Sequence, residues 1–121
     1  MRALGADSLV WNAANNATAW SHFLGGGAPG PYAVPARATD VAGMPPTYLT
    51  VNELDPLRDE GLELGRRLLG AGVSVELHCW PGAPHGFATL VPDADVSRRA
   101  HDALLEALAR GVGAAVRPPL A

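Results

Sequence analysis

The sequence predicts an α/β fold in which two parallel strands are joined by a helix and flanked by further helices. Two apolar segments with strand character, residues 47–51 and 73–80, are separated by a helical segment, and another helical segment follows. A strand–helix–strand order places the strands parallel, with a right-handed crossover. Two strands leave an apolar edge open, so we expect another chain or a second copy to complete the sheet.

The first 46 residues are predicted to form a short helix and a long irregular connection. Apolar residues recur at helical spacing over residues 16–24, and three glycines then stop the helix. Residues 28–46 contain five prolines, which argue against regular structure. Residues 1–46 should therefore lead into the strand–helix–strand–helix segment, residues 47–110, of a single domain spanning residues 1–121.

The segment at residues 47–51 reads Thr-Tyr-Leu-Thr-Val and is bounded by prolines, which is typical of a buried strand. The following helix opens at Pro56 or Asp59 and runs to about Leu69. Acidic residues in its first turn complement the helix dipole, and we expect Arg58 to pair with Asp59 or Glu60. Its buried side is predicted to carry leucines and a groove of glycines: Leu62, Leu68 and Leu69 with Gly61, Gly65 and Gly72.

The second strand shows a period of two over residues 73–80. Its core face is predicted to consist of Val73, Val75, Leu77 and Cys79. The last helix opens near Asp95 and ends at Gly111 and Gly113, before a loose tail at residues 111–121. Its apolar face is predicted to consist of Val96, Ala100, Ala103, Leu104, Ala107 and Leu108.

Composition excludes several classes of function. The formal net charge is −3, and the nine basic residues are scattered arginines, so neither nucleic acid nor an anionic membrane surface is an expected partner. No apolar run near the N-terminus is long enough for a signal peptide or a membrane span. The single Cys79 excludes an intrachain disulfide and fits a reducing compartment, so we expect a cytoplasmic protein.

Two titratable residues follow the two strands. Asp55 comes just after the first strand and His85 five residues after Trp80, so both are expected at the same edge of the sheet. A carboxylate in that place can orient an imidazole for proton transfer. A zinc site made by His78, Cys79 and His85 is disfavoured because neighbours on a strand point to opposite faces, and a buried Cys79 would be inert as a nucleophile. No metal and no cofactor are expected.

Three motifs resemble a known family. Pro45-Pro46, the Asp-Pro-Leu-Arg-Asp-Glu-Gly segment at residues 55–61 and the Pro-Gly-Ala-Pro-His-Gly-Phe segment at residues 81–87 are similar to the C-terminal part of hormone-sensitive-lipase-like esterases, the α/β-hydrolase fold-3 group. Residues 20–24 and 31–35 resemble the preceding connection less specifically. The resemblance implies a partial α/β-hydrolase fold with Asp55 as triad acid, His85 as triad base and Phe87 as a substrate-binding candidate.

The chain departs from that family in lacking two of its motifs. It has neither the H-G-G-G oxyanion loop nor a G-x-S-x-G nucleophile elbow around any of its serines, which are Ser8, Ser21, Ser74 and Ser97. We therefore expect a truncated or split carboxylic ester hydrolase, inactive alone, that acts on small acyl esters if a complementing N-terminal hydrolase half supplies the serine. The alternative is a non-catalytic α/β module that self-associates through its open strand edge.

Three aromatic residues precede this segment, and two roles are open to them. Trp11, Trp20 and Phe23 either line a substrate pocket or form part of a hydrophobic core or partner contact, and we favour the second role.

Overall fold

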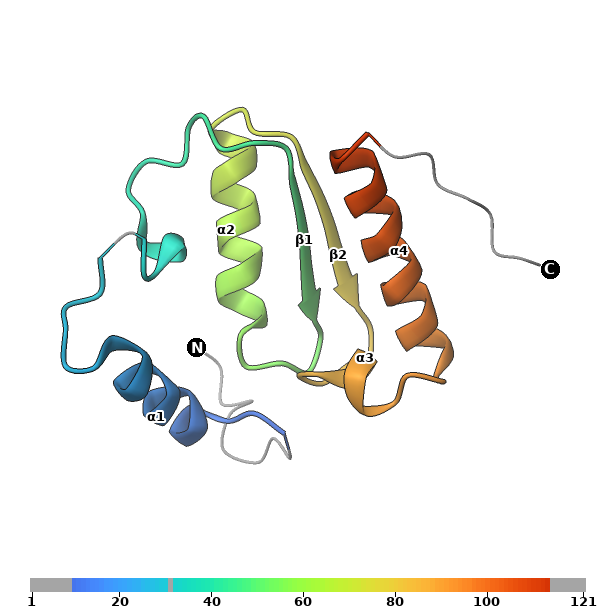
Figure 1. Ribbon diagram of the computed structural model, residues 1–121, viewed down its shortest axis with the longest axis horizontal. Helices are drawn as coiled ribbons and strands as arrows, with labels where there is room; N and C mark the ends of the chain where they lie inside the picture. The colour runs from blue at the N-terminus through green and yellow to red at the C-terminus, as the bar shows by residue number, and fades with distance from the viewer. Residues whose placement is uncertain (1–9, 31, 114–121) are drawn as a thin grey trace. The chain divides into compact units, whose positions relative to one another are not determined.

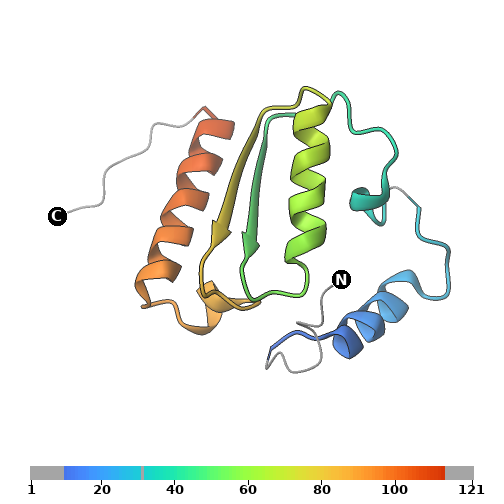
Figure 2. The same ribbon diagram turned by 180° about the vertical axis from the view of Figure 1, so that it is seen from behind.

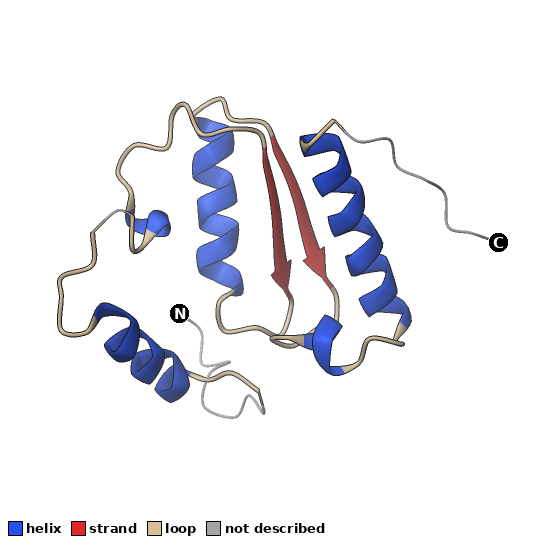
Figure 3. Ribbon diagram, in the orientation of Figure 1, coloured by secondary structure: helices blue, strands red, loops and turns tan. Residues whose placement is uncertain are grey.

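The computed structural model describes residues 10–30 and 32–113 (Figure 1). The chain forms two compact units, Met1–His85 and Gly86–Ala121. The elements of the first unit are α1 (Ala13–Leu24), the 3-10 turn η1 (Pro35–Arg37), β1 (Thr47–Asn52), α2 (Arg58–Gly70) and β2 (Val75–Trp80). The second unit contains α3 (Phe87–Leu90) and α4 (Asp95–Gly111). In its described residues, the connection between α1 and β1 carries one short 3-10 helix, η1 (Figure 3).

The two strands pair in parallel, from Thr47 opposite Val75 to Asn52 opposite Trp80, which confirms the predicted strand–helix–strand order. Their arrows run side by side in the same direction when the chain is seen from either side (Figures 1 and 2). Because Asn52 and Trp80 end the strands at the same level, the two loops that follow begin at one edge of the sheet. Among the described residues, the outer edge of β1 has no strand partner.

Glycines allow α2 to approach the sheet closely. A Cβ at Gly61 would lie 2.5 Å from Val51 Cγ1, and one at Gly65 would lie 2.6 Å from Leu77 Cδ1. The predicted groove is therefore confirmed for these two residues. It is wrong for Gly72, which has a φ of 80° and ends the turn after α2, with nothing near its side-chain position.

The buried stripe of α2 differs from the prediction. Leu68 is 1% exposed as predicted, whereas Leu69 is 57% exposed and Leu62 is 36% exposed. The stripe follows Gly61, Gly65 and Leu68, which recur at the helical period, and Leu62 and Leu69 each lie about 100° further round the helix. The two glycines, and not the two outer leucines, set which side of α2 meets the sheet.

The predicted core face of β2 is wrong at Cys79, which is exposed, and Leu77 on the same face is 36% exposed although it lies against Gly65 of α2. Cys79 pairs in register with Val51 of β1, and Gly61 of α2 lies against Val51 only. At this end of the sheet the helix therefore covers β1 and leaves Cys79 open. The buried residue at this end of β2 is Trp80 on the opposite face, 6% exposed, whose Nε1 donates to Thr50 Oγ1 at 2.8 Å.

Helix α1 begins three residues earlier than predicted because Asn12 caps it. The Asn12 Oδ1 atom accepts a hydrogen bond from the Asn15 amide at 2.9 Å. The helix ends as predicted at Gly25, which adopts a left-handed conformation with a φ of 54° and donates its amide to Ser21 O.

The second unit contains one helix that the sequence did not predict, α3, whose four residues are too few to show a period. Helix α4 has the predicted bounds within a residue, but Leu104 and Leu108 of its predicted buried face are 49% and 59% exposed. Within this unit, α3 is too short to cover more than about one turn of α4. None of the described helices is long and apolar enough to span a membrane. Ser8, Pro31 and most of the predicted tail lie outside the described residues.

Candidate active site

Asp55 is a buried carboxylate at the carboxyl end of β1, only 6% exposed. Its Oδ1 accepts a hydrogen bond from the Leu57 amide at 2.9 Å, and its Oδ2 accepts one from Asn52 Nδ2 at 3.3 Å. Its backbone carbonyl accepts the Arg58 amide at 3.1 Å. Burying a carboxylate is costly unless its oxygens are hydrogen-bonded, and this turn supplies donors to both. The turn between β1 and α2 therefore holds Asp55 in one orientation.

His85 lies beside this carboxylate, as its place after β2 predicted. Its Nδ1 is 2.9 Å from Asp55 Oδ2. Because an ionised carboxylate can only accept, Nδ1 must be the protonated ring nitrogen and donate the bond. The lone pair of a neutral imidazole is then on Nε2, which makes no hydrogen bond within the described part of the chain. The His85 side chain is 36% exposed, so Nε2 remains open to a reacting group.

A second set of contacts joins the loop of Asp55 to the loop of His85. Glu53 Oε2 accepts the Gly82 amide at 2.6 Å, and the Leu54 amide donates to Ala83 O at 3.0 Å. Arg58 Nη1 donates to Glu53 O at 2.7 Å, and its Nε pairs with Asp59 at 2.8 Å, which confirms the predicted partner of Arg58. The hydrogen bond to the Asp59 carboxylate raises the pKa of the Arg58 guanidinium. The two loops therefore form one hydrogen-bonded unit.

The face of the His85 ring is covered by an aromatic residue far away in the sequence. Trp11 stacks on His85 with ring centroids 5.2 Å apart and an interplanar angle of 22°. The indole Nε1 donates to Asn16 Oδ1 at 3.3 Å, which links the tryptophan to the first turn of α1. Sequence reasoning gave Trp11 no contact with His85, because no local pattern reports a contact over such a separation.

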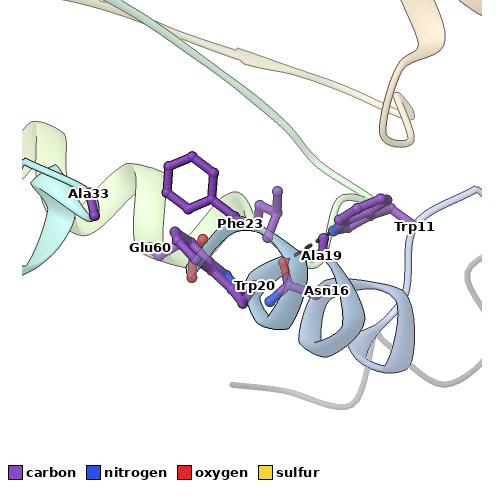
Figure 4. Close-up of a pocket in the computed structure, with 8 residues that line it drawn as sticks. Trp11, Asn16, Ala19, Trp20, Phe23, Ala33 and Glu60 are labelled. Atoms are coloured by element: carbon purple, nitrogen blue, oxygen red, sulfur yellow. Dashed lines mark hydrogen bonds between the residues drawn. The ribbon is translucent and has the colours of Figure 1, made fainter. Parts of the chain in front are cut away.

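Trp11 is also one wall of a pocket of about 290 Å³ (Figure 4). The three aromatic residues singled out from the sequence, Trp11, Trp20 and Phe23, all line it. Phe23 is 68% exposed and meets Trp20 edge-on, so it is not a core residue. The remaining lining residues come from α1, the connection, the turn before α2 and α2 itself: Asn16, Ala19, Ala33, Leu57 and Glu60. The pocket and the Asp55–His85 pair thus share the Trp11 side chain.

Other candidates lie away from this pair. His78 Nε2 donates a hydrogen bond to Glu76 Oε1 at 2.9 Å, and the ring stacks on Trp80, on the face of β2 opposite to Cys79. In the described ranges, no cluster of three or more His, Cys, Asp or Glu side chains could hold a metal ion. Ser74 precedes β2, at the end of the strand opposite to His85. Phe87 opens α3 in the second unit and is 5% exposed; its role in substrate binding remains a prediction.

Asn52 and Glu53 were missed by sequence reasoning as supports of the pair. Their side chains contact Asp55 and the His85 loop respectively. The one feature of the sequence that could have indicated this role is their position immediately before Asp55, at the end of a predicted strand.

Comparisons with known proteins agree with this geometry. A model of the alpha/beta hydrolase fold family matches residues 1–89. The chain is 45% identical over 69 residues to "Esterase LipI" of Mycobacterium tuberculosis, covering 54% of this chain and 21% of that protein. It is 33% identical over 78 residues to human "Hormone-sensitive lipase", covering 63% of this chain and 7% of that protein.

The same likeness appears among solved structures. The structure described as "Bacterial Heroin Esterase" superimposes with a TM-score of 0.81 at 50% identity, over 88% of this chain and 36% of that one. The chain thus spans about a fifth of the length of LipI and about a third of this solved esterase. The family match extends over most of the 121 residues and includes both loops of the Asp55–His85 pair. The chain belongs to the alpha/beta hydrolase fold family.

Proposed function

We propose that this chain supplies the acid and the base of a Ser-His-Asp carboxylic ester hydrolase. The observation that carries the proposal is the 2.9 Å hydrogen bond between His85 Nδ1 and Asp55 Oδ2 at the carboxyl ends of two parallel strands. Asp55 holds the ring in the tautomer that leaves Nε2 unprotonated. Nε2 can then take the proton of a serine hydroxyl during attack on the ester and return it to the leaving alcohol.

The serine nucleophile would come from a complementing hydrolase half. The 121 residues contain no G-x-S-x-G elbow and no H-G-G-G loop. Because triad members act as a unit, the chain alone should be inactive as an esterase. The single cysteine, Cys79, is the observation in favour of a cytoplasmic setting.

The substrate would be a small acyl ester with one substituent in the pocket beside Trp11. Two features of the pocket support a small, apolar substituent: its volume of about 290 Å³ and its walls, which include three aromatic side chains. A pocket of this kind binds a compact apolar group and gains affinity from its burial. Because Trp11 touches His85, a group in the pocket would bring its ester bond near Nε2.

The outer edge of β1 would be covered by that complementing half or by a second copy of the chain. In the described residues this edge has no strand partner, and an open apolar edge favours association with another strand. This edge also supports the second candidate function, a non-catalytic module that self-associates. We expect neither nucleic acid nor a membrane as partner.

The test is hydrolysis of p-nitrophenyl acetate by the chain alone and by the chain mixed with a hydrolase fragment that carries a G-x-S-x-G elbow. Wild type is compared with His85→Ala and with His101→Ala, whose imidazole lies in α4 of the second unit and serves as the matched control. We expect no turnover beyond the His85→Ala background from the chain alone. The mixture should hydrolyse the ester with wild type and His101→Ala but not with His85→Ala.

Two results would reject the proposal. Turnover in the mixture that survives His85→Ala would show that His85 is not the base. A stable complex with the fragment, or a homodimer in sedimentation, without any turnover would favour the interaction module instead.

A further inference from the structure

Glu60 places a carboxylate beside the aromatic pocket. It belongs to the first turn of α2 and lines the 290 Å³ pocket together with Trp11, Trp20 and Phe23 (Figure 4). It also lines a neighbouring hollow of about 680 Å³, and Trp20 is the other residue common to both. Glu60 therefore lies where the two hollows meet.

The charge of Glu60 is not neutralised by a neighbour in the described ranges. Two other acidic residues of α2 have arginine partners: Asp59 pairs with Arg58 and Glu63 with Arg66, each at 2.8 Å. Glu60 makes no such ion pair and no side-chain hydrogen bond there. The one arginine at these hollows is Arg37, which lines the larger hollow and not the smaller one. The aromatic pocket thus carries a single negative charge.

Aromatic faces combined with a carboxylate are the chemistry that binds ammonium groups. An ammonium over the face of a tryptophan is attracted by the ring quadrupole, and the gain is about 0.5 to 2 kcal/mol, larger when water is excluded. A carboxylate at the rim adds attraction for any cation. A neutral group of the same shape gains only the apolar contact with the rings.

We propose that this pocket binds a quaternary or tertiary ammonium group, so that the esters preferred at the site carry such a cation in the part that enters the pocket. The ester part of this inference rests on the proposed function, whereas the binding of the cation does not. Trp11 lies between the pocket and His85, so an ammonium held near Trp20 and Glu60 would leave a short ester arm directed to the imidazole.

The binding test uses choline and its neutral isostere 3,3-dimethylbutan-1-ol, titrated into the full chain and followed by tryptophan fluorescence and NMR. We expect choline to bind about tenfold more tightly than the neutral probe, as a cation–π contact and one carboxylate predict. Glu60→Gln should reduce that preference, because only the cation–π contact then remains, while leaving the neutral probe unaffected. Glu63→Gln is the matched control, because Glu63 is on the same helix but lines neither hollow, and it should keep the preference.

Equal affinity for the two probes in wild type, or an unchanged preference in Glu60→Gln, would overturn the inference. Trp20→Leu should also reduce the preference for choline, and its failure to do so would overturn the role of the aromatic wall.

A comparison of a cationic ester with a neutral ester of the same shape distinguishes this inference from the proposed function. In the complemented mixture, acetylcholine is compared with 3,3-dimethylbutyl acetate. Hydrolysis of both at equal rates would reject the ammonium site and leave the esterase proposal intact. Selective choline binding without hydrolysis of either ester would reject the esterase proposal and leave the ammonium site intact.

Discussion

Trp11 stacks on the imidazole of His85, with ring centroids 5.2 Å apart and ring planes inclined by 22°. The edge of the same ring is held at Nδ1 by Asp55. Gly82 and Gly86 flank the His85 turn with φ values of 66° and 71°, so the backbone there needs conformations that other residues rarely adopt. The ring is thus fixed at one edge and one face, and Nε2 is the nitrogen left for proton exchange.

Replacing Trp11 by leucine should change the magnetic environment of His85. A stacked indole shields the imidazole protons, so we expect the ring protons of His85 to move downfield in Trp11→Leu. The measurement is a proton–carbon NMR spectrum of the histidine rings. Trp20→Leu is the control, because Trp20 lines the same pocket but its ring meets Phe23. Identical His85 shifts in wild type and Trp11→Leu would mean that the two rings do not stack in solution.

Replacing Asp55 by asparagine should move the proton on the His85 ring. Asparagine presents an amide donor where Asp55 presents an acceptor, so the ring lowers its free energy by carrying its proton on Nε2. Nitrogen NMR shifts of the imidazole distinguish the two tautomers. We expect protonated Nδ1 in wild type and in the control Asp102→Asn, and protonated Nε2 in Asp55→Asn. A wild-type ring protonated at Nε2 would contradict the proposed role of Asp55.

Removing the Asp55 carboxylate altogether should destabilise the chain. Asp55→Ala leaves the Leu57 amide, Asn52 Nδ2 and His85 Nδ1 without their acceptor. A buried donor without a partner costs about 1–3 kcal/mol, so the free energy of unfolding should fall by at least that amount. Urea unfolding measures it. A change of less than about 0.5 kcal/mol, as is usual for exposed surface positions, would show that this turn is open to water.

Glu53 should support the pair through the His85 loop. Its Oε2 accepts the Gly82 amide at 2.6 Å, so Glu53→Ala should speed hydrogen exchange of that amide. It should also broaden the Nδ1 proton signal of His85, because the loop is then less firmly held. Glu53→Gln keeps an acceptor oxygen and should largely restore both signals, whereas Glu106→Ala in α4 should affect neither. Unchanged exchange at Gly82 in Glu53→Ala would remove Glu53 from this role.

The sequence was sufficient to predict the two strands, the helix between them and the proximity of Asp55 to His85. These depend on local patterns: a β-branched run between prolines for the first strand, a period of two for the second, and the rule that parallel strands end at one edge. The acid and base motifs are likewise contiguous segments of the chain.

Contacts between distant segments could not be predicted in this way. Leu62 and Leu69 of α2 and Cys79 of β2 were predicted as core residues from their hydrophobicity alone, and all three are exposed. Which side of an element is covered is decided by packing against other segments. The stacking of Trp11 on His85 and the pocket around Trp20 depend on how the connection folds back, and residues 25–46 contain little regular structure to predict this.

The ion pair on the outer face of α2 should make stability depend on pH. Hydrogen bonding to Arg66 lowers the pKa of Glu63. The folded pKa is below the unfolded one, so the stabilisation is present above the unfolded pKa and is lost as pH falls through the folded pKa. The Tm difference between wild type and Glu63→Gln should therefore exist at neutral pH and vanish in acid. A difference that stays constant over this range would mean that the pair does not form in solution.

The close approach of α2 to the sheet gives a matched pair of glycine substitutions. Alanine stabilises a helix by about 1 kcal/mol relative to glycine when there is room for its methyl group. Gly70 ends α2 with nothing within 4 Å of its side-chain position, so Gly70→Ala should raise the midpoint of urea unfolding. A methyl group at Gly61 would lie 2.5 Å from Val51 Cγ1.

Val51 is β-branched and 6% exposed, so its side chain cannot rotate away from the added methyl group. Overpacking of this kind costs about 1–3 kcal/mol, which exceeds the gain in helix propensity, and Gly61→Ala should therefore lower the unfolding midpoint. Because α2 begins just after Asp55, the displaced helix should also weaken the bond from the Leu57 amide to Asp55 and with it the Nδ1 signal of His85. If Gly61→Ala were as stabilising as Gly70→Ala, α2 would not lie against β1 at this distance, and the glycines would not set the position of the acid loop.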